Sequence, residues 1–424
     1  MKLWSPIIWF YLLVASLPFI RIPSALIFGV HIRLSIVIGA VFILLVFVKN
    51  PRAFLPQTFI ARLLYGFLIV CVLSAINSQR PLHALTITAF TLFTALLAVA
   101  SSQIIDQINL RTFLKTLFFS ALASALFGLY QFIGDLLGIP TSFTGLRSAY
   151  TAHVFGFPRI QSTALEPLYY ANYLLLPISL LIALGSYLKR TWLISILLTT
   201  ILMLTLSRGG VAALAMMALG WILLYIVKHK YRQIGVIAGV GVASIILTIA
   251  ALIVVVPALY KAPINKPALS AYSDQLTNYE VGDFKADRTY TRKIALEAFK
   301  ENPWLGVGPG NFGRYINAKD TRYPISQIVN NEPDELLAET GVLGFGVFFA
   351  FALALGINAI RQLRRFDTPM TQLGWGLLFY LFAAGIQYYS FSTLYIVHIW
   401  VAIGLLLGIT FALQRRPSRH ILSI

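Results

Sequence analysis

A succession of long apolar stretches constrains the fold of this chain more than any other feature. A helix that crosses the hydrocarbon core of a bilayer needs roughly 20 predominantly apolar residues. About twelve stretches qualify, near residues 6–20, 33–48, 61–76, 84–101, 113–133, 168–187, 191–206, 209–227, 233–256, 341–360, 372–390 and 394–412. Only 11% of the residues are charged, against roughly 25% in soluble proteins. The sequence therefore predicts an all-α integral membrane protein with about twelve transmembrane helices.

The distribution of basic residues predicts how these helices are oriented, because cytoplasmic loops carry an excess of lysine and arginine. With the N-terminus inside, the cytoplasmic side holds 17 of the 33 basic residues and only Asp106 and Asp367 of the 15 acidic ones. Its net charge is then +15, whereas the outer side has +3. We therefore expect both termini in the cytoplasm, and we attribute the net charge of +18 to membrane topology, not to nucleic-acid binding.

Two of the predicted outer loops are longer than the others, and the larger one, residues 257–340, holds most of the acidic residues. Within it, Asp287–Lys300 has the pattern of a helix, and Gly306–Gly310 is typical of turns. A short helix is expected from Asn311, and another from near Pro333 into the tenth span. The loop is therefore expected to form a helical subdomain.

This pattern divides the chain into three parts. Residues 1–256 are predicted to hold spans 1–9, and residues 257–340 the external helical subdomain. Residues 341–424 are predicted to hold spans 10–12 and a cytoplasmic tail. The second outer loop, residues 137–167, is of medium length.

Arg208 is the most informative charged residue, because arginine on the outer side runs against the usual charge bias. It lies in the sequence Ser207-Arg208-Gly209-Gly210, a tight turn at which the next span begins. Free backbone N–H groups, the positive end of the helix dipole and a guanidinium group then come together, which suits a phosphate or pyrophosphate. The alternative is an arginine that extends to the lipid headgroups.

Further outer arginines accompany it. Arg147 and Arg159 precede Glu166 in the loop 137–167, and Arg288 and Arg292 lie four residues apart, on one face of the predicted outer helix. Together they are candidates to bind an anionic substrate. Alternatively, Arg159 and Glu166 form a structural ion pair. For Arg292 we favour a surface ion pair with Asp287 or Glu297.

The third candidate cluster is the acidic segment Asn330-Asn331-Glu332-Pro333-Asp334-Glu335. Glu332 is the best candidate for a general base, with Asn330 and Asn331 beside it for substrate binding. The alternative is that the whole segment is an ordinary helix start, where asparagine or glutamate caps the helix, proline occupies the first turn and acidic residues follow.

We expect neither a metal nor a cofactor. The six histidines are scattered, without the spacing of metal ligands, and each is expected to be structural: His31, His83, His153, His229, His398 and His420. No outer loop contains an Asp-x-Asp pair that would hold a divalent cation. The single cysteine, Cys71, excludes an intramolecular disulfide and a cysteine-based metal site.

Three segments in this order, with the long outer loop between them, resemble one known family. The segments are Ser207–Gly210, Arg288 followed by Asn302–Phe312, and Asn331 followed by Leu336–Gly344. They are similar to motifs of the O-antigen ligase/polymerase superfamily (the Wzy/WaaL type). The resemblance covers about residues 160–360.

This resemblance implies an inverting, metal-independent glycosyltransferase of the GT-C type in the bacterial inner membrane, with its active site facing the periplasm. The donor would be a glycan on undecaprenyl pyrophosphate, and the acceptor a second lipid-linked glycan or the lipid A core. A chain-length regulator is a further partner that the family allows. By matching positions, Arg208 and Arg288 would hold the pyrophosphate leaving group and offset its developing negative charge.

One departure from the family pattern bears on the reaction. The ligase branch has a histidine, the expected base, at the position of Asn330. An asparagine amide does not accept a proton at neutral pH. The departure favours a polymerase that joins lipid-linked repeat units, with Glu332 as base or with catalysis mainly by leaving-group stabilisation and positioning. A ligase is the alternative within the family, and a solute transporter with twelve spans is the alternative outside it.

Overall fold

The structure, a computed structural model, describes residues 4–21, 24–27, 30–152, 158–185, 191–260 and 283–415, without the side chains of residues 24–27, 30–32 and 283–287. The elements before the central gap are α1 (Pro6–Ser16), β1 (Ser24–Ile27), β2 (Val30–Arg33), α2 (Leu34–Lys49), η2 (Pro51–Phe54), α3 (Phe59–Ser74), η3 (Ala75–Asn77), α4 (Pro81–Gln103), η4 (Ile105–Gln107), α5 (Leu110–Leu136), α6 (Thr141–Thr144), η5 (Ser148–Tyr150), α8 (Pro167–Leu184), α9 (Thr191–Leu204), α10 (Arg208–Val227), α11 (Tyr231–Ala250), the π-helical turn η6 (Ala251–Val255) and α12 (Val256–Leu259). After the gap come α14 (Asp283–Glu301), α15 (Phe312–Lys319), α16 (Glu332–Leu363), α17 (Pro369–Gln387) and α18 (Val397–Arg415).

Nine helices in the described part of the chain are long and apolar enough to cross a membrane. They are α3 with η3, α4, α5, α8, α10, α11 with its continuation to Leu259, α16, α17 and α18. Three shorter apolar helices, α1, α2 and α9, coincide with the remaining predicted stretches. The protein is a multi-pass membrane protein, and the prediction of a helical membrane domain is confirmed.

A small β-hairpin, which the sequence analysis did not predict, connects the first two of these helices. Strand β1 pairs antiparallel with β2, with Ser24 opposite Arg33 and Ile27 opposite Val30. Each strand has only four residues, too few for a clear alternation of apolar and polar residues. The hairpin matters for the site because it ends at Arg33, directly before α2.

Glycine residues allow the central helices to approach closely. A Cβ atom added to Gly404 or Gly408 of α18 would collide with backbone atoms of Ala98 or Ser102 on α4. Gly376 of α17 has a similarly close neighbour in α8. Small residues commonly permit such contacts between membrane helices, because the helices are held together by packing and hydrogen bonds, not by a hydrophobic driving force.

A buried polar network joins three of these helices. The Asn172 side chain on α8 donates to Gln387 of α17 at 2.8 Å, and its oxygen lies 2.9 Å from Nε2 of His398 on α18. All three side chains are almost inaccessible to solvent. His398 therefore has a structural position, as predicted for this histidine, whereas His153 lies outside the described residues.

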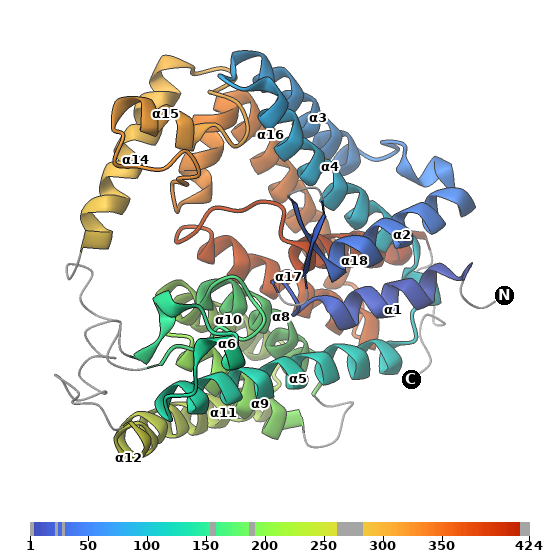
Figure 1. The fold of residues 1–424 in the computed structure, drawn as a ribbon. Helices are drawn as coiled ribbons and strands as arrows, with labels where there is room; N and C mark the ends of the chain where they lie inside the picture. The colour runs from blue at the N-terminus through green and yellow to red at the C-terminus, as the bar shows by residue number, and fades with distance from the viewer. Residues whose placement is uncertain are drawn as a thin grey trace.

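Helices α14 and α15 pack beside α16 at one corner of the molecule, away from α5, α9 and α11 (Figure 1). Their small core includes Ile294, Ala298, Phe312, Ile316 and Val329, all buried. Helix α14 contains the predicted helix Asp287–Lys300, and α15 and α16 begin within a residue of the predicted starts. The helices predicted in the second half of the long loop are therefore confirmed.

A glycine-rich turn joins α14 to α15 and packs on α16. The N–H groups of Val307 and Gly308 donate to Ala338 and Glu339, both at 2.9 Å, and the N–H of Val342 donates to Pro303 at 2.8 Å. Gly341 has φ +64° within α16, and a Cβ there would collide with the backbone of Trp304. The kink at Gly341 thus divides α16 into a short segment beside the turn and a long apolar segment.

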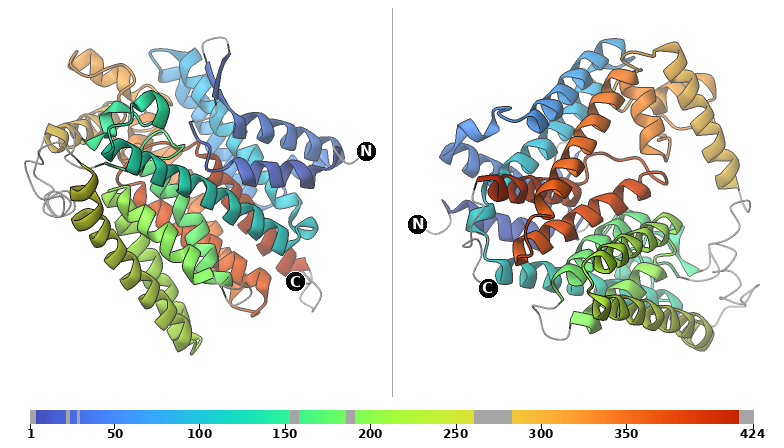
Figure 2. Two further views of the ribbon diagram at one scale, coloured as in Figure 1. Left: turned by 60° about the horizontal axis from the view of Figure 1, so that its bottom comes forward. Right: turned by 180° about the vertical axis from the view of Figure 1, so that it is seen from behind.

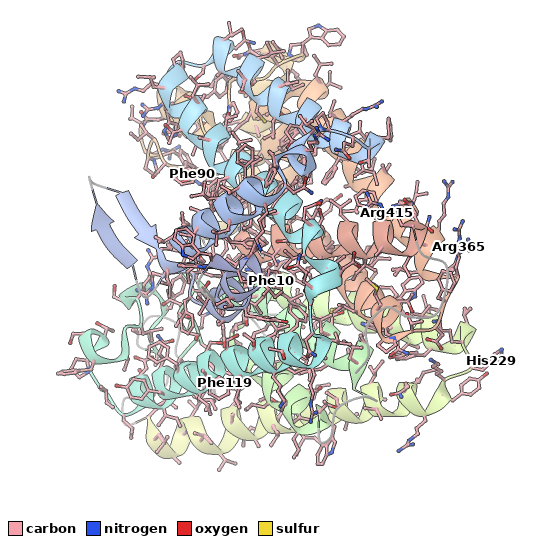
Figure 3. The ribbon with its side chains drawn as sticks, turned by 90° about the vertical axis from the view of Figure 1, so that its right-hand side faces the viewer. Phe10, Phe90, Phe119, His229, Arg365 and Arg415 are labelled. Atoms are coloured by element: carbon pink, nitrogen blue, oxygen red, sulfur yellow. The ribbon has the colours of Figure 1, made fainter. Side chains whose placement is uncertain are left out.

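The two ends of the bundle carry different elements. Helices α6, α12 and α14 lie towards one end, here called the α14 end, and the turn between α10 and α11 lies at the other (Figure 2, left). Figure 3 shows His229, Arg365 and Arg415 together at one end of the bundle, opposite the β-hairpin. His229 follows α10, Arg365 follows α16, and Arg415 is the last residue of α18. Three predicted cytoplasmic segments therefore lie at one end.

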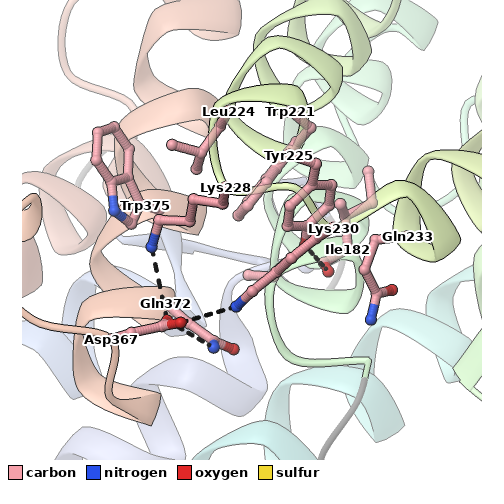
Figure 4. Close-up of a pocket in the computed structure, with 11 residues that line it drawn as sticks. Ile182, Trp221, Leu224, Tyr225, Lys228, Lys230, Gln233, Asp367, Gln372 and Trp375 are labelled. Atoms are coloured by element: carbon pink, nitrogen blue, oxygen red, sulfur yellow. Dashed lines mark hydrogen bonds and ion pairs between the residues drawn. The ribbon is translucent and has the colours of Figure 1, made fainter.

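A salt-bridge cluster holds this opposite end together (Figure 4). Asp367, between α16 and α17, lies 2.8 Å from Nζ of Lys230 and 3.6 Å from Nζ of Lys228. Gln372 also donates to Asp367 at 3.2 Å. The loops that precede α11 and α17 therefore lie side by side, as the charge distribution predicts for two loops on the same side of the membrane.

Candidate functional site

Arg208 is the first residue of α10, at a helix start that two glycines allow to pack tightly. Ser207 caps the helix by accepting a hydrogen bond from the N–H of Gly210 at 3.2 Å. A Cβ atom at Gly209 would collide with Ser390, and one at Gly210 would lie 2.6 Å from Cβ of Ala171. The Ser-Arg-Gly-Gly sequence therefore places a half-buried arginine where α10 meets α8 and the segment after α17.

Arg159 lies beside this turn and stabilises it. Its Nε and Nη2 donate to the carbonyl oxygens of Thr205 and Leu206, at 3.1 and 3.3 Å. Leu206 has φ +56°, an unfavourable conformation for a leucine. Part of the guanidinium of Arg159 is thus bound to the backbone just before Arg208. The sequence analysis, which proposed Arg159 as a substrate ligand or an ion-pair partner of Glu166, did not predict this contact.

Three of the predicted arginines come together here. The pKa of Arg159 is lowered to about 10, mainly by burial. Tyr150 and Glu166 raise this pKa, whereas the positive charges of Arg208 and Arg288 lower it. Arg159 therefore remains charged at neutral pH, close to two further positive charges. The charge of Arg288, which is exposed on α14, acts on Arg159 although α14 and α10 are separated by the central gap in the described chain.

Tyr150 joins the remaining residues of the loop 137–167 to this group. Its ring lies 5.7 Å from the Arg159 guanidinium carbon and 5.8 Å from that of Arg147. Burial raises the pKa of Tyr150, and Glu166, which also forms a hydrogen bond with it, raises this pKa further. Arg147, Arg159 and Glu166 are thus neighbours, as predicted, around a tyrosine that the sequence gave no reason to choose.

Arg292 does not join them, and it forms a surface ion pair with a residue that the sequence analysis did not name as its partner. Its Nε lies 2.6 Å from Oδ2 of Asp334 in the first turn of α16, and its side chain is 55% exposed. Glu297 is instead paired with Lys319 at 3.3 Å, and the side chain of Asp287 lies outside the described part. Because α14 packs against the start of α16, a residue distant in sequence pairs with Arg292, and Glu297 has another partner.

The start of α16 settles which residue caps this helix. Asn331 is the N-cap, and its side chain accepts a hydrogen bond from the N–H of Asp334 at 3.1 Å. Asn330, with φ +60°, makes the turn before it. The side chain of Glu332, the first helical residue, is therefore not needed as a cap.

The Glu332 carboxylate is buried, with 6% of the residue exposed. Within the described residues, its Oε2 has no hydrogen-bond partner. Its backbone N–H donates to the carbonyl of Tyr388 at 2.9 Å. A buried carboxylate oxygen without a partner is costly, and such groups are found where a substrate or catalytic step uses them.

Two further glutamates on the same helix have structural partners instead. Glu335 accepts a hydrogen bond from the N–H of Val329 at 2.7 Å. Glu339 accepts from the N–H groups of Gly310 and Phe312, at 2.7 and 3.2 Å, and so attaches the glycine-rich turn to α16. Of these three carboxylates, Glu332 is the one with an oxygen left for chemistry.

The segment between α17 and α18, residues 388–396, connects the two halves of the site. Tyr388 accepts from Glu332, Ser392 accepts from the N–H of Asn331 at 2.9 Å, and the hydroxyls of Thr393 and Tyr169 lie 2.8 Å apart. Gly209 packs on this segment from the other side. Its polar sequence, Tyr-Tyr-Ser-Phe-Ser-Thr between two apolar spans, was the available signal for a functional role.

Arg33, at the end of the hairpin, is a further arginine that the sequence analysis did not select. Burial lowers its pKa, while Tyr395 and Tyr169 lie near enough to favour its charged form. Tyr169 is the neighbour of Thr393 described above. The N-terminal hairpin thus adds positive charge beside the same segment.

Within the described residues, no group of three histidine, cysteine, aspartate or glutamate side chains is placed to hold a metal ion. The charged groups described at the site are the arginines, Glu166 beside Tyr150, and the buried carboxylate of Glu332 with its unpartnered oxygen. Such a set is suited to binding a phosphorylated substrate and accepting a proton.

Comparison with known families decides the identity of the chain. Residues 193–349 match the family model described as O-antigen ligase. The chain therefore contains a domain of the O-antigen ligase/polymerase family. It is therefore a membrane glycosyltransferase that acts in the assembly of lipid-linked glycans, and the transporter alternative loses its support. None of the curated proteins matches the chain.

The matched O-antigen ligase/polymerase domain extends from α9 to the first half of α16. It contains Arg208, Arg288 and Glu332. Arg147, Arg159 and Glu166 precede it, although the fold brings them to the same place. The family assignment thus covers one half of the arginine group, and tertiary structure supplies the other half.

Proposed function

We propose that the protein polymerises oligosaccharide repeat units carried on undecaprenyl pyrophosphate, by a metal-independent, inverting transfer. The observation that carries this proposal is the pairing of an arginine group, Arg208 and Arg288, with a buried carboxylate that has an unpartnered oxygen, Glu332. The segment 388–396 holds the helices of Arg208 and Glu332 together.

In the proposed reaction, a sugar hydroxyl of the acceptor attacks the anomeric carbon of the donor. The bond from this carbon to the pyrophosphate oxygen breaks, and its electron pair leaves with undecaprenyl pyrophosphate. Arg208 and Arg288 bind that leaving group and offset its growing negative charge, with about 3 kcal/mol of stabilisation for each well-placed donor. Glu332 accepts the proton of the attacking hydroxyl. Attack opposite the leaving group inverts the configuration.

A polymerase is favoured over a ligase by the residue before Asn331. Asn330 occupies the position at which the ligase branch has a histidine, and its amide does not accept a proton. Glu332 is two residues further on, at the helix start. A ligase that transfers glycan to the lipid A core is the second candidate, supported by the description of the matching family as O-antigen ligase.

The proposed orientation places the α14 end in the periplasm and both termini in the cytoplasm of a bacterial inner membrane. Twelve helices would cross the bilayer, of which α1, α2 and α9 are the shorter ones. The joined loops around Asp367, rich in lysine and arginine, support a cytoplasmic location for the opposite end. In this orientation residues 257–340 form the periplasmic subdomain between spans nine and ten.

One experiment separates the two activities. The purified protein in lipid nanodiscs is incubated with lipid-linked repeat units in the presence of EDTA, and the products are separated by size. A ladder of longer lipid-linked chains supports the polymerase. Product only when the lipid A core is added would indicate the ligase, and activity only after magnesium or manganese is restored would refute a metal-independent reaction.

A further inference from the structure

Two arginines, Arg21 and Arg147, form a second positively charged group next to the one around Arg208. Arg21 follows α1, and its Nη2 donates to the carbonyl of Gly145. Arg147 donates from Nη1 to the carbonyl of Leu165 at 3.1 Å. Both guanidinium groups are thus attached to the loop between α5 and α8, and Arg147 contacts the ring of Tyr150.

These two arginines lack negative partners. The Nε of Arg21 is buried and has no hydrogen-bond partner within the described residues. Neither guanidinium forms an ion pair with a carboxylate in the same part of the chain. Burial lowers the pKa of Arg21, and the nearby charge of Arg147 lowers it further. Two adjacent positive charges with a buried, unused donor are stabilised by an anion that offers several oxygens.

Tyr150 divides the positive charge into two groups. Its ring contacts Arg147 and Arg159 at similar distances. The positive charges near Arg159 are those of Arg208 and Arg288, whereas the positive charge near Arg21 is that of Arg147. The arginines therefore form two groups, Arg21 with Arg147 and Arg159 with Arg208 and Arg288, and each group offers positive charge to an anion.

The chemistry of a polymerase requires two such groups, because donor and acceptor both carry a lipid pyrophosphate. In the donor, the pyrophosphate is attached to the reacting carbon. In the acceptor, an oligosaccharide separates the pyrophosphate from the reacting hydroxyl, so this pyrophosphate must bind away from the reaction centre. Arg147, next to Arg21, is linked through the ring of Tyr150 to Arg159, which binds the backbone just before Arg208.

We propose, on the basis of the proposed polymerase function, that Arg21 and Arg147 bind the pyrophosphate of the acceptor lipid. Their planar guanidinium groups match phosphate oxygens in a bidentate manner and stay charged at any physiological pH. The subsite selects an acceptor that is still attached to its lipid carrier, and it distinguishes this acceptor from free oligosaccharide.

A competition between two acceptors tests this subsite. Lipid-linked repeat units serve as donor and as the first acceptor. The second acceptor is the same oligosaccharide as a methyl glycoside, which keeps its sugars but has no pyrophosphate and cannot be a donor. Both acceptors react with the same bound donor. The ratio of lipid-linked to methyl-glycoside product therefore measures acceptor preference, and it does not depend on donor binding or on the fraction of active protein.

We expect the unaltered protein to prefer the lipid-linked acceptor, and Arg147→Gln to shift the product ratio towards the methyl glycoside by about 10-fold. Arg21→Gln combined with Arg147→Gln should shift it further, and Arg21→Lys should keep part of the preference. Arg147 is exposed, so its replacement is compatible with folding. Arg80→Gln, at an exposed arginine before α4, is the matched control and should leave the ratio unchanged.

Other outcomes would overturn the subsite. Equal losses of both products in the Arg147 variant would mean that this residue contributes to donor binding, to binding of acidic sugars in either substrate, or to folding. An unchanged ratio in the double variant would mean that another group binds the acceptor pyrophosphate. A shift that appears only in nanodiscs without phosphatidylglycerol would assign the two arginines to bilayer headgroups. No product from either acceptor with the unaltered protein would refute the polymerase itself, and the acceptor subsite with it.

Discussion

At the scale of single residues, three glutamates on one helix differ in what their oxygens contact. Glu335 and Glu339 bind backbone N–H groups, whereas Glu332 keeps one buried oxygen without a partner in the described part of the protein. Position, not residue type, therefore separates a structural carboxylate from a candidate base. The helix cap, which could have explained Glu332 without any chemistry, is provided by Asn331.

Glu332→Gln should slow chain growth by about 100-fold or more, because the amide cannot accept the proton of the attacking hydroxyl. Binding of the lipid-linked donor should stay near that of the unaltered protein. Turnover and donor binding are measured separately, by product ladders and by binding to protein in nanodiscs. Glu335→Gln is the matched control, since its amide oxygen can still accept from Val329. Full activity of Glu332→Gln would exclude it as the base.

Arg208→Ala and Arg288→Ala should each reduce chain growth by about 100-fold or more, because each removes a donor to the leaving group. Arg208→Lys should recover only part of the rate, since lysine has charge without the bidentate geometry. Lys293→Ala, an exposed cation on the same helix as Arg288, is the control and should be active. Product ladders at saturating substrate give the rates, and active alanine variants would remove both arginines from the mechanism.

Residue-scale reasoning from the sequence depends on single local signals. Arg208 at a helix start and Glu332 in an acidic segment were selected as candidates in this way. Tyr150, Arg21 and Arg33 were missed, because their importance lies in contacts with residues far away in sequence. The Arg292–Asp334 pair shows the same limit, since Arg292 pairs with a residue 42 positions away.

At the scale of elements, the glycine-rich turn and the kink in α16 depend on each other. The turn donates backbone hydrogen bonds to Ala338 and Glu339, next to Gly341. The sequence predicted the helices and turns of this region correctly, because each has its own capping and breaking residues. It also predicted a helix from near Pro333 into the tenth span, but it did not reveal the kink at Gly341 that divides this helix.

Gly341→Ala should destabilise this arrangement by about 2 kcal/mol or more, because an alanine is strained at positive φ and its Cβ meets the Trp304 backbone. Thermal unfolding in detergent, followed by intrinsic fluorescence, should show a lower Tm. Gly346→Ala on the same helix is the control. No heavy atom lies within 4 Å of its added Cβ among the described residues, so its Tm should be unchanged or slightly higher. Equal Tm values for both variants would contradict the kink as a required feature.

At the scale of the whole molecule, the arrangement of loops agrees with the charge distribution of the sequence. The salt bridges of Asp367 and the common location of His229, Arg365 and Arg415 place several basic loops at one end. The site residues lie towards the α14 end. Periodicity and charge were sufficient to predict this plan, because a bilayer imposes the same rules on every span.

Cysteine labelling in whole cells tests the proposed orientation. In a protein with Cys71→Ala, a cysteine at Ser326 should react with a membrane-impermeant maleimide added from outside, because residue 326 is exposed near the α14 end. A cysteine at Arg365, exposed at the opposite end, should react only after the membrane is permeabilised. The reverse pattern would invert the topology and move the site to the cytoplasm.

The segment 388–396 has a consequence for the biogenesis of this enzyme. The ribosome synthesises the chain from its N-terminus. The helices that begin at Arg208 and Glu332 therefore enter the bilayer before residues 388–396, which connect them, are made. Tyr388, Ser392 and Thr393 follow both helix starts in the sequence and are therefore translated later. A nascent chain that stops at Gln387 should therefore carry all proposed catalytic residues and still fail to retain donor lipid. The glycan is then not cleaved from its lipid carrier until residues 388–396 have been made.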